Sequence, residues 1–288
     1  MNADLAGCFR HDGRTYLVAG AGGDGIGTAT AELLSALGSH VVCVDRDGDA
    51  ARGAAEATGG DWLAGDITDE QAVVSMVATA VERHGRLDGM VDVVGGSTFT
   101  SIPELTLEEW NGQFTSNLQH AFLLGRHVGN HLAANGGGGM VFVGSNAALN
   151  GSRTFPAYST AKLALIGWVR SLAEEFGPSG VRANVVAPGA TLTQRMADIW
   201  SPGGKADMAK PTMLGRLGTS QEIAGPVAFL LSHAAGNITA QTLVVDGGAT
   251  LKDPVYGSGT NRGGAEIRAR HHPSEPVRAS VDNDVVGS

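Results

Sequence analysis

Short apolar runs alternate along this chain with longer segments in which apolar residues recur at helical spacing. The runs are apolar at consecutive positions, as expected of strands covered on both faces of a parallel sheet. We therefore predict an α/β fold with a seven-stranded, doubly wound parallel sheet and helices on both faces. The predicted strands are residues 15–20, 40–45, 61–66, 89–95, 139–145, 181–189 and 241–248.

Helices are predicted between the strands, and three of their starts have the pattern of a capping box. In that motif a hydroxyl at the cap accepts a backbone N–H bond, and a side chain three residues later accepts one from the cap. The three pairs are Thr68 with Gln71, Thr106 with Glu109, and Thr219 with Glu222. The helices are expected to start near Gly25, Asp47, Asp69, Leu107, Tyr158 and Gln221.

The alternation of strands and helices predicts one domain over residues 14–250, preceded by an N-terminal extension of residues 1–13. Residues 251–288 are rich in Gly, Pro, Arg and acidic side chains, so we predict a C-terminal tail there. The tail is either disordered, or an arm that contacts a neighbouring subunit or the active site. Val255 and Tyr256 are the anchors that such an arm offers.

Composition and charge narrow the class of partners. The formal net charge of −9 repels polyanions, so we expect no nucleic-acid partner. No apolar run approaches the roughly 20 residues of a membrane-spanning helix, so we expect no membrane span. The two cysteines give no disulfide framework, and with Cys43 inside an apolar run they favour a reducing, cytoplasmic location.

A glycine-rich turn joins the first predicted strand to the first helix. Gly20, Gly22 and Gly25 fit the pattern G-x-G-x-x-G, and Ile26 and Gly27 follow directly. Because glycine lacks Cβ, the backbone N–H groups of such a turn can approach a pyrophosphate at the positive end of a helix. The turn therefore predicts dinucleotide binding in a Rossmann-type fold.

Asp45 ends the second predicted strand, about 20 residues after the glycines, where a carboxylate accepts hydrogen bonds from the adenosine ribose. A carboxylate there also repels a 2′-phosphate, which favours NAD(H) over NADP(H). Arg46 leaves NADP(H) open, because a base beside the ribose tolerates that phosphate. Asp is also a good helix cap, and Asp45 and Asp47 can divide the two roles.

Tyr158 and Lys162 lie four residues apart on one predicted helix, so their side chains rise from the same face. The pKa of a phenol is about 10, and a neighbouring ammonium lowers it by favouring the phenolate. The spacing alone also fits an ordinary amphipathic helix.

Together with the run that ends in Ser145, the glycine turn and residues 184–190 (NVVAPGA), this pair makes the chain resemble the short-chain dehydrogenase/reductase family in its common one-domain form. The resemblance covers residues 14–248. It implies hydride transfer between nicotinamide and a secondary alcohol or ketone, without a metal.

The resemblance also implies roles for single residues. Tyr158 is implied as the general acid/base, and Lys162 as the group that lowers its pKa and binds the nicotinamide ribose. Ser145 is implied to polarise the substrate oxygen and Asn117 to hold a water of the proton relay, although they could instead cap a turn and fill a core position. Cofactor contacts are implied for Gly20, Gly22, Gly25, Ile26, Gly27, Asp45, Asp66, Ile67, Gly95, Tyr158, Lys162, Pro188, Thr191 and Thr193.

The segment between Pro188 and Pro211 resembles the mobile substrate lid of such enzymes, with residues 202–204 as a hinge. Its apolar side chains predict a hydrophobic, cyclic or aromatic substrate, unless they pack on the lid itself. The predicted lid residues are Leu192, Met196, Ile199, Trp200 and Met208.

Two helices, predicted over residues 107–135 and 158–176, build a subunit interface in the family. The resemblance therefore implies a homotetramer, with a dimer as the alternative. His120, His127 and His131 lie on the first helix, and we expect them to be solvated or at the interface rather than bound to a metal.

The chain departs from the family pattern at three places. Asp24 is an insertion in the glycine turn, where it either points to solvent or weakens cofactor binding. The usual N-N-A-G after the fourth strand is replaced by residues 92–95 (DVVG), which puts in doubt the hydrogen bonds that tie this strand to the Asn117 helix. Ala240 stands where glycine is commoner, which we expect to be a minor change.

Three functions remain open at this point. The leading prediction is an NAD(H)-dependent alcohol dehydrogenase or ketoreductase. The alternatives are an NADPH-dependent 3-oxoacyl thioester reductase and a non-catalytic dinucleotide-binding subunit. The intact set of Asn117, Ser145, Tyr158 and Lys162 argues against the last of these.

Overall fold

The structure is a computed structural model that describes residues 7–199 and 201–252. The chain divides into a unit of residues 1–250 and a second unit of residues 251–288. The predicted tail, with Val255 and Tyr256, therefore lies outside the described residues except for its first two positions.

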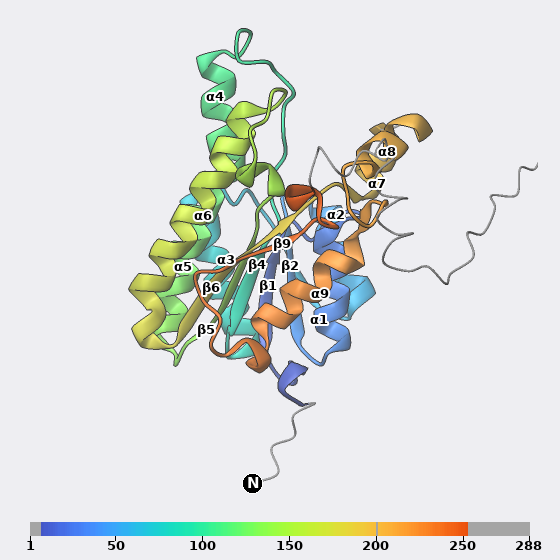
Figure 1. Ribbon diagram of the computed structural model, residues 1–288. Helices are drawn as coiled ribbons and strands as arrows, with labels where there is room; N and C mark the ends of the chain where they lie inside the picture. The colour runs from blue at the N-terminus through green and yellow to red at the C-terminus, as the bar shows by residue number, and fades with distance from the viewer. Residues whose placement is uncertain (1–6, 200, 253–288) are drawn as a thin grey trace, which may run out of the picture. The chain divides into compact units, whose positions relative to one another are not determined.

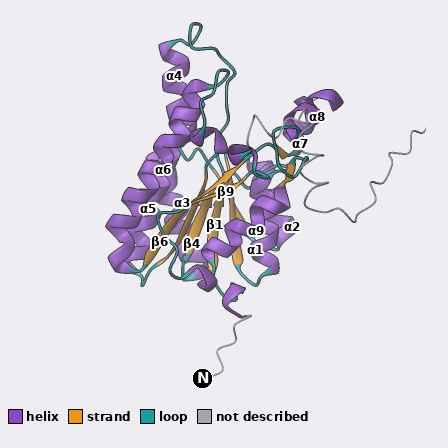
Figure 2. Ribbon diagram, in the orientation of Figure 1, coloured by secondary structure: helices purple, strands orange, loops and turns teal. Residues whose placement is uncertain are grey.

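The seven predicted strands are confirmed, and they form one parallel sheet with the strand order β3-β2-β1-β4-β5-β6-β9. Every neighbouring pair is parallel, so the carboxyl ends of all seven strands meet at one edge (Figures 1 and 2). A two-stranded ladder of β7 (Thr191–Leu192) and β8 (Gly218–Thr219) lies apart from this sheet. The sheet strands are β1 (Thr15–Ala19), β2 (His40–Asp45), β3 (Asp61–Ala64), β4 (Gly89–Asp92), β5 (Gly138–Val143), β6 (Val181–Pro188) and β9 (Thr242–Val245).

Helices cover both faces of the sheet, as a doubly wound fold requires (Figure 1). On one face lie α3 (Glu70–His84), α5 (His120–Ala134) and α6 (Pro156–Phe176), and on the other lie α1 (Ile26–Ala36), α2 (Gly48–Thr58) and α9 (Ser220–Leu231). The shorter helices are α4 (Leu107–Phe114), α7 (Gln194–Ile199) and α8 (Pro202–Ala209).

The strand sequences are apolar throughout because each strand supplies two cores. In β1, Leu17 packs in the core under α3, α5 and α6, whereas its neighbours Tyr16 and Val18 pack in the core under α1 and α9. All three side chains are fully buried. Alternate residues of one strand therefore face opposite helix layers, which explains why strict polar alternation is missing from the sequence.

Two of the three predicted capping boxes are present, at Thr106 with Glu109 and at Thr219 with Glu222. The prediction for Thr68 with Gln71 is wrong. Asp69 caps α3 instead, since its carboxylate accepts the N–H of Ala72. The Thr68 hydroxyl donates to Asp66. An aspartate directly after the threonine thus supplied the stronger cap.

The helix predicted over residues 107–135 is continuous but contains a π-helical turn. That turn, Thr115–Gln119, separates α4 from α5 and contains Asn117. A π-turn inserts one extra residue into the helical repeat, and such turns occur frequently at functional sites. Within residues 7–199 and 201–252, no helix is long and apolar enough to cross a membrane.

Candidate active site

Six of the predicted site residues lie at or just after the carboxyl ends of strands, which the parallel sheet brings to a single edge. Ligands bind at this edge in open α/β sheets. The strand ends concerned are those of β1, β2, β3, β4, β5 and β6, which lead into Gly20, Asp45, Asp66, Gly95, Ser145 and Pro188.

The glycine turn after β1 is so tight that two of its positions require glycine. Gly20 has a φ of +80°, in the region that favours glycine. Any Cβ on Gly27 would collide with the carbonyl of Gly20, so α1 approaches the strand end closely. At Gly25 a Cβ would meet open space. In the described chain no side chain caps α1, so its first backbone N–H groups keep the partial positive charge that attracts anions.

Asp45 is held at this turn by two backbone N–H donors. Its Oδ2 accepts from Gly22 at 3.1 Å, and its Oδ1 accepts from Asp47 at 3.1 Å. Asp47 caps α2 with its own carboxylate, so Asp45 is not the cap of this helix. The Asp45 carboxylate is thus fixed beside the glycines.

The inserted Asp24 is exposed, and its backbone carbonyl accepts from the N–H of Gln194 at 3.3 Å. Its side chain therefore lies at the surface of the turn.

After β3, Asp66 accepts from the hydroxyl and the N–H of Thr68, and these bonds lower the pKa of Asp66 below its ordinary value. Ile67, next to it, is buried in the core.

Lys162 is buried, with only 2% of its surface exposed. Its Nζ donates to the carbonyl of Val143 at 3.0 Å and to that of Val94 at 3.4 Å. Val143 is the last residue of β5 and Val94 follows the end of β4, so the ammonium is fixed between the ends of two strands. Burial lowers the pKa of Lys162 to about 8, and attraction by the Asp92 carboxylate raises it in opposition.

Tyr158 lies one turn before Lys162 on α6, and the Lys162 Nζ is 6.0 Å from the centre of its ring. The Tyr158 ring also contacts Phe155 edge-on, at a centroid distance of 5.9 Å. Phe155 in turn contacts Phe99 edge-on at 5.7 Å, and Phe99 is 69% exposed. Three aromatic rings thus lead from the surface to Tyr158. Sequence patterns gave no signal for the two phenylalanines, because they come from separate loops.

Asn117 is fully buried and pairs with the backbone of Gly96 in both directions, accepting and donating at 3.0 Å. Gly95, next to this pair, has a φ of +152°. A Cβ there would lie 2.6 Å from Oδ1 of Asn117 and 2.9 Å from Nζ of Lys162. Gly95 is therefore the place where these two side chains converge on the end of β4.

Ser145 follows β5 and caps the short 3-10 helix Asn146–Leu149 by accepting the N–H of Ala147 at 3.1 Å. The capping alternative considered for this serine is therefore present. A hydroxyl that accepts one bond still has its own hydrogen to donate, so the cap leaves the Ser145 hydroxyl able to act on a second group.

The loop after β6 contains the predicted nicotinamide and lid residues. Pro188 ends β6, and the buried Thr191 donates its hydroxyl to the carbonyl of Gly189. The Thr193 hydroxyl accepts the N–H of Met196 at the start of α7. Leu192 is 41% exposed.

Of the other predicted lid residues, Met208 is exposed, Met196 is half-buried, and Trp200 and the side chain of Ile199 lie outside the described residues. The tripeptide predicted as a hinge, residues 202–204, forms the first turn of α8, which Ser201 caps.

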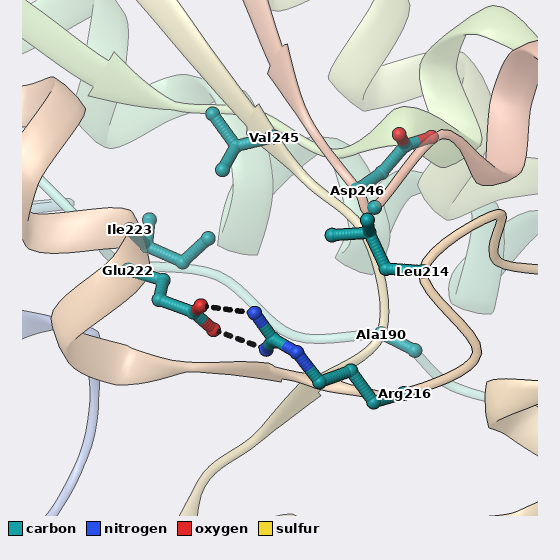
Figure 3. A pocket seen from close by; sticks show the side chains of 9 residues that line it. Ala190, Leu214, Arg216, Glu222, Ile223, Val245 and Asp246 are labelled. Carbon is teal, nitrogen blue, oxygen red and sulfur yellow. Dashed lines mark hydrogen bonds and ion pairs between the residues drawn. The ribbon is translucent and has the colours of Figure 1, made fainter.

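A pocket lies beside this loop, lined by Ala190, Val245 and Leu214 among others (Figure 3). Arg216 and Glu222 form a bidentate ion pair along its wall, with distances of 2.6 and 2.8 Å. None of the four predicted catalytic residues lines this pocket. Its third charged group, Asp246, accepts hydrogen bonds from Gly248 and Thr250, so all three charged side chains of the pocket have partners.

The structure reveals a buried pair that the sequence did not predict. His120 was expected to be solvated or at an interface, which is wrong: it is 1% exposed, and its Nδ1 lies 2.7 Å from Oδ2 of the buried Asp92. The hydrogen bonds in doubt after the loss of N-N-A-G are thus replaced by an acid–histidine bond between β4 and α5. The aspartate in the altered motif was the only signal in the sequence.

His127, on the same helix, bonds Glu70 at 2.9 Å on the surface. Among the residues that the structure describes, no three His, Cys, Asp or Glu side chains form a group that could hold a metal ion.

The geometry can be compared with known proteins. Residues 20–250 match the family model described as enoyl-(acyl carrier protein) reductase. The chain is 34% identical to D-threitol dehydrogenase of Mycolicibacterium smegmatis, over 85% of this chain and 95% of that protein. It is 35% identical to cis-4-hydroxycyclohexanecarboxylate dehydrogenase of Sinomonas cyclohexanicum, over 82% and 96%.

The fold is also that of a solved 7α-hydroxysteroid dehydrogenase in complex with NADH and 7-oxo glycochenodeoxycholic acid. The TM-score is 0.79 at 31% identity, with 84% of this chain and 96% of that chain covered. The parallel sheet, the glycine turn and these relatives agree in one assignment. The chain belongs to the short-chain dehydrogenase/reductase family and is an oxidoreductase of alcohols and ketones.

Proposed function

We propose that this protein is an NAD(H)-dependent oxidoreductase that interconverts a hydrophobic, cyclic or aromatic secondary alcohol and its ketone, with Tyr158 as the general acid/base. The observation that carries the proposal is the buried ammonium of Lys162, fixed on two backbone carbonyls and 6.0 Å from the ring of Tyr158. A bound nicotinamide dinucleotide supplies the hydride donor or acceptor.

The proton transfer rests on the charge of Lys162. With a pKa of about 8, Lys162 is largely protonated at neutral pH. In a buried site a cation attracts a phenolate more strongly than in water, which lowers the pKa of Tyr158. Tyr158 can then take a proton from the alcohol or return it to the ketone. The hydroxyl hydrogen of Ser145 donates to the substrate oxygen, and Asn117 holds a water of the relay.

The residues of the glycine turn fit a dinucleotide. The uncapped N-terminus of α1 offers N–H groups to the pyrophosphate. Asp45, fixed by Gly22 and Asp47, presents a negative charge where an adenosine 2′-phosphate would lie. This charge supports NAD(H) as the cofactor, and NADH is present in the related hydroxysteroid dehydrogenase structure.

The aromatic rings of Phe99 and Phe155 support an apolar substrate. They lead from the surface to Tyr158, and Phe99 leaves most of its surface open to contact a ligand. Leu192 adds an exposed apolar side chain from the lid. Ring substrates suit such a wall, because flat apolar faces bury area against aromatic edges at low entropic cost. The relatives act on both polyols and ring alcohols, so the wall is the discriminating feature.

A panel of ring and linear secondary alcohols, followed by the absorbance of reduced nicotinamide, tests the activity and the substrate class. Tyr158→Phe should lower kcat by about a thousandfold, as expected for the loss of a general acid/base. The affinity for NADH, measured by fluorescence, should stay at the wild-type value. Wild-type turnover by the Phe variant would refute the role of Tyr158.

The cofactor is tested by comparing rates with NAD and NADP. Asp45→Ser should raise the relative rate with NADP, because the repulsion of the 2′-phosphate is lost. Asp49→Ser is the matched control, since Asp49 is an exposed aspartate of α2 that pairs with Arg52. A wild-type protein that prefers NADP would contradict the proposed role of Asp45.

A second candidate is an NADPH-dependent 3-oxoacyl thioester reductase. The observation in its favour is Arg46, which is exposed directly beside Asp45 and could contact a 2′-phosphate. Faster reduction of a 3-oxoacyl thioester with NADPH than of cyclic ketones with NADH would select it. One argument for the non-catalytic alternative was the loss of the amides that connect β4 to the Asn117 helix. The bond between Asp92 and His120 replaces that connection, so this argument is weakened.

We also propose a homotetramer, with a dimer as the alternative, in the cytoplasm. Phe122 on α5 and Leu163 on α6 are apolar and about half exposed, at 42% and 53%. Phe122 lies beside Trp168 of α6, so these two side chains form an apolar contact between the two helices. Light scattering gives the state, and Phe122→Asp with Leu163→Asp should yield a smaller species.

A further inference from the structure

A buried acid–histidine pair lies directly behind the proposed catalytic residues. Asp92 ends β4 and is 2% exposed, and His120 begins α5 and is 1% exposed. Oδ2 of Asp92 is 2.7 Å from Nδ1 of His120. Neither side chain takes part in the proton transfer proposed above, yet burying both is costly unless they remain paired.

The imidazole of His120 is held between two acceptors. Its Nε2 lies 3.1 Å from the carbonyl oxygen of Ser116, and its Nδ1 faces the Asp92 carboxylate. A carbonyl can only accept, so Nε2 carries a proton, and the bond to the carboxylate needs a second one between Nδ1 and Oδ2. The two bonds together fix both the position and the rotation of the ring.

The pair connects β4 to the π-turn that contains Asn117. Ser116, which accepts from His120, directly precedes Asn117 and also contacts its amide, at 3.0 Å. The chain that leaves β4 continues to Val94, which accepts from Lys162, and to Gly96, which pairs with Asn117. The segment from Asp92 to Gly96 therefore contacts two of the proposed catalytic residues, Asn117 and Lys162. His120 adds a third connection, which runs from Asp92 to Ser116 in the Asn117 turn.

With its two protons the pair has no net charge, but of its two members only Asp92 shifts the pKa of Lys162. The Asp92 carboxylate attracts the ammonium and so raises the pKa of Lys162 against the effect of burial. Two further groups face this cluster from other elements. Asp66, after β3, interacts with His120, and Tyr158 of α6 faces Lys162. The amide that usually stands at position 92 in the family carries no such charge.

We propose that Asp92 and His120 form a positioning pair that holds the Asn117 turn against β4 and keeps the Asp92 carboxylate where it attracts Lys162. The geometry carries this inference: two buried groups, three fixed bonds and a direct path to Asn117 and Lys162. The proposal rests on the proposed function, because Tyr158 and Lys162 are the groups that the pair serves. Its first test therefore needs neither substrate nor cofactor.

That test is the phenolate titration of Tyr158, followed by absorbance and isolated by subtracting the titration of Tyr158→Phe. Asp92→Asn keeps the shape of the side chain and removes the charge, so Lys162 should lose its proton at lower pH. Tyr158 then loses its cationic neighbour, and the midpoint of its titration should move to higher pH. His84→Gln is the control, since His84 pairs with Asp61 at the amino end of β3, and it should leave the midpoint in place. An unmoved midpoint in Asp92→Asn would overturn the proposal.

The second test separates the two bonds of His120 by kinetics. His120→Asn places an amide near Nδ1 and keeps the bond to Asp92, whereas His120→Gln reaches the position of Nε2 and keeps the bond to Ser116. Each variant should lower kcat by about tenfold to a hundredfold, because the Asn117 turn is displaced. The KM for the cofactor should not change. In Asp92→Asn, the acid limb of kcat/KM for alcohol oxidation should move to higher pH with the midpoint of Tyr158.

If both His120 variants melt at lower temperature but retain wild-type kcat, the pair is only structural and the proposal is wrong. If Asp92→Asn does not fold, His120→Asn decides, because it keeps the carboxylate and its bond. A wild-type protein without turnover on any alcohol or ketone would refute the proposed function. The phenolate titration would still decide the role of the pair.

Discussion

Replacing Lys162 with Met should stabilise the protein at neutral pH while it removes the proposed activity. Lys162 is buried, and its pKa of about 8 lies well below the ordinary 10.5. At about 1.4 kcal/mol for each pKa unit, the buried ammonium costs about 3 kcal/mol of folding free energy below pH 8. Met fills the same space without the charge, but it leaves the carbonyls of Val94 and Val143 without this donor, at about 1 kcal/mol each. The expected net gain is about 1 kcal/mol.

The pH dependence of this gain follows from proton binding. Between about pH 8 and 10.5 the unfolded chain holds the Lys162 proton and the folded protein does not, so the stability of the wild type rises with pH in this window. The Met variant lacks this rise, and its advantage should become a deficit near pH 10.5. Because Tyr16 and Cys43 titrate alike in both proteins, the difference between the two isolates Lys162.

Urea unfolding at about pH 7 and about pH 10 measures the difference directly, and both proteins should show the same m-value. Lys210→Met serves as a control, since Lys210 is an exposed lysine of the region after α8, and it should change stability at neither pH. A Met variant that is less stable than wild type by the same amount at both pH values would refute the reasoning. Lys162 would then not be a desolvated cation in the folded protein.

Two further predictions concern the backbone. Gly95→Ala should lower kcat by about a hundredfold, because the new Cβ would displace Asn117 and Lys162. Gly53→Ala is the control. A Cβ at Gly53, on α2, would meet open space, so this variant should retain wild-type kcat. Wild-type kcat in Gly95→Ala would show that the two side chains need not converge there. Ala240 has a φ of +60°, so Ala240→Gly should leave stability unchanged or raise it by up to about 1 kcal/mol, whereas Ala57→Gly within α2 should lower it by about 1 kcal/mol. Thermal melting compares them, and equal losses would argue against strain at Ala240.

The strain at Ala240 also shows where a motif comparison falls short. From the sequence, we expected alanine in place of glycine at this position to be a minor change. In the structure Ala240 has a left-handed backbone conformation, and its N–H donates to the carbonyl of Ala183. Similarly, the sequence at the start of α3 permits either Thr68 or Asp69 as the cap. Both residues suit the role, and only the path of the chain from β3 selects Asp69.

The sequence by itself determined the elements and their order, because a strand covered on both faces must be apolar at every position and a helix repeats at its own period. It also determined that Tyr158 and Lys162 share a face, since that spacing is local to one helix. Only the tertiary structure decided that Lys162 is buried on Val94 and Val143, and that Asp92 meets His120, 28 residues further along the chain. Those contacts form where the carboxyl ends of parallel strands meet the helices above them, and no local pattern specifies which buried groups become neighbours there.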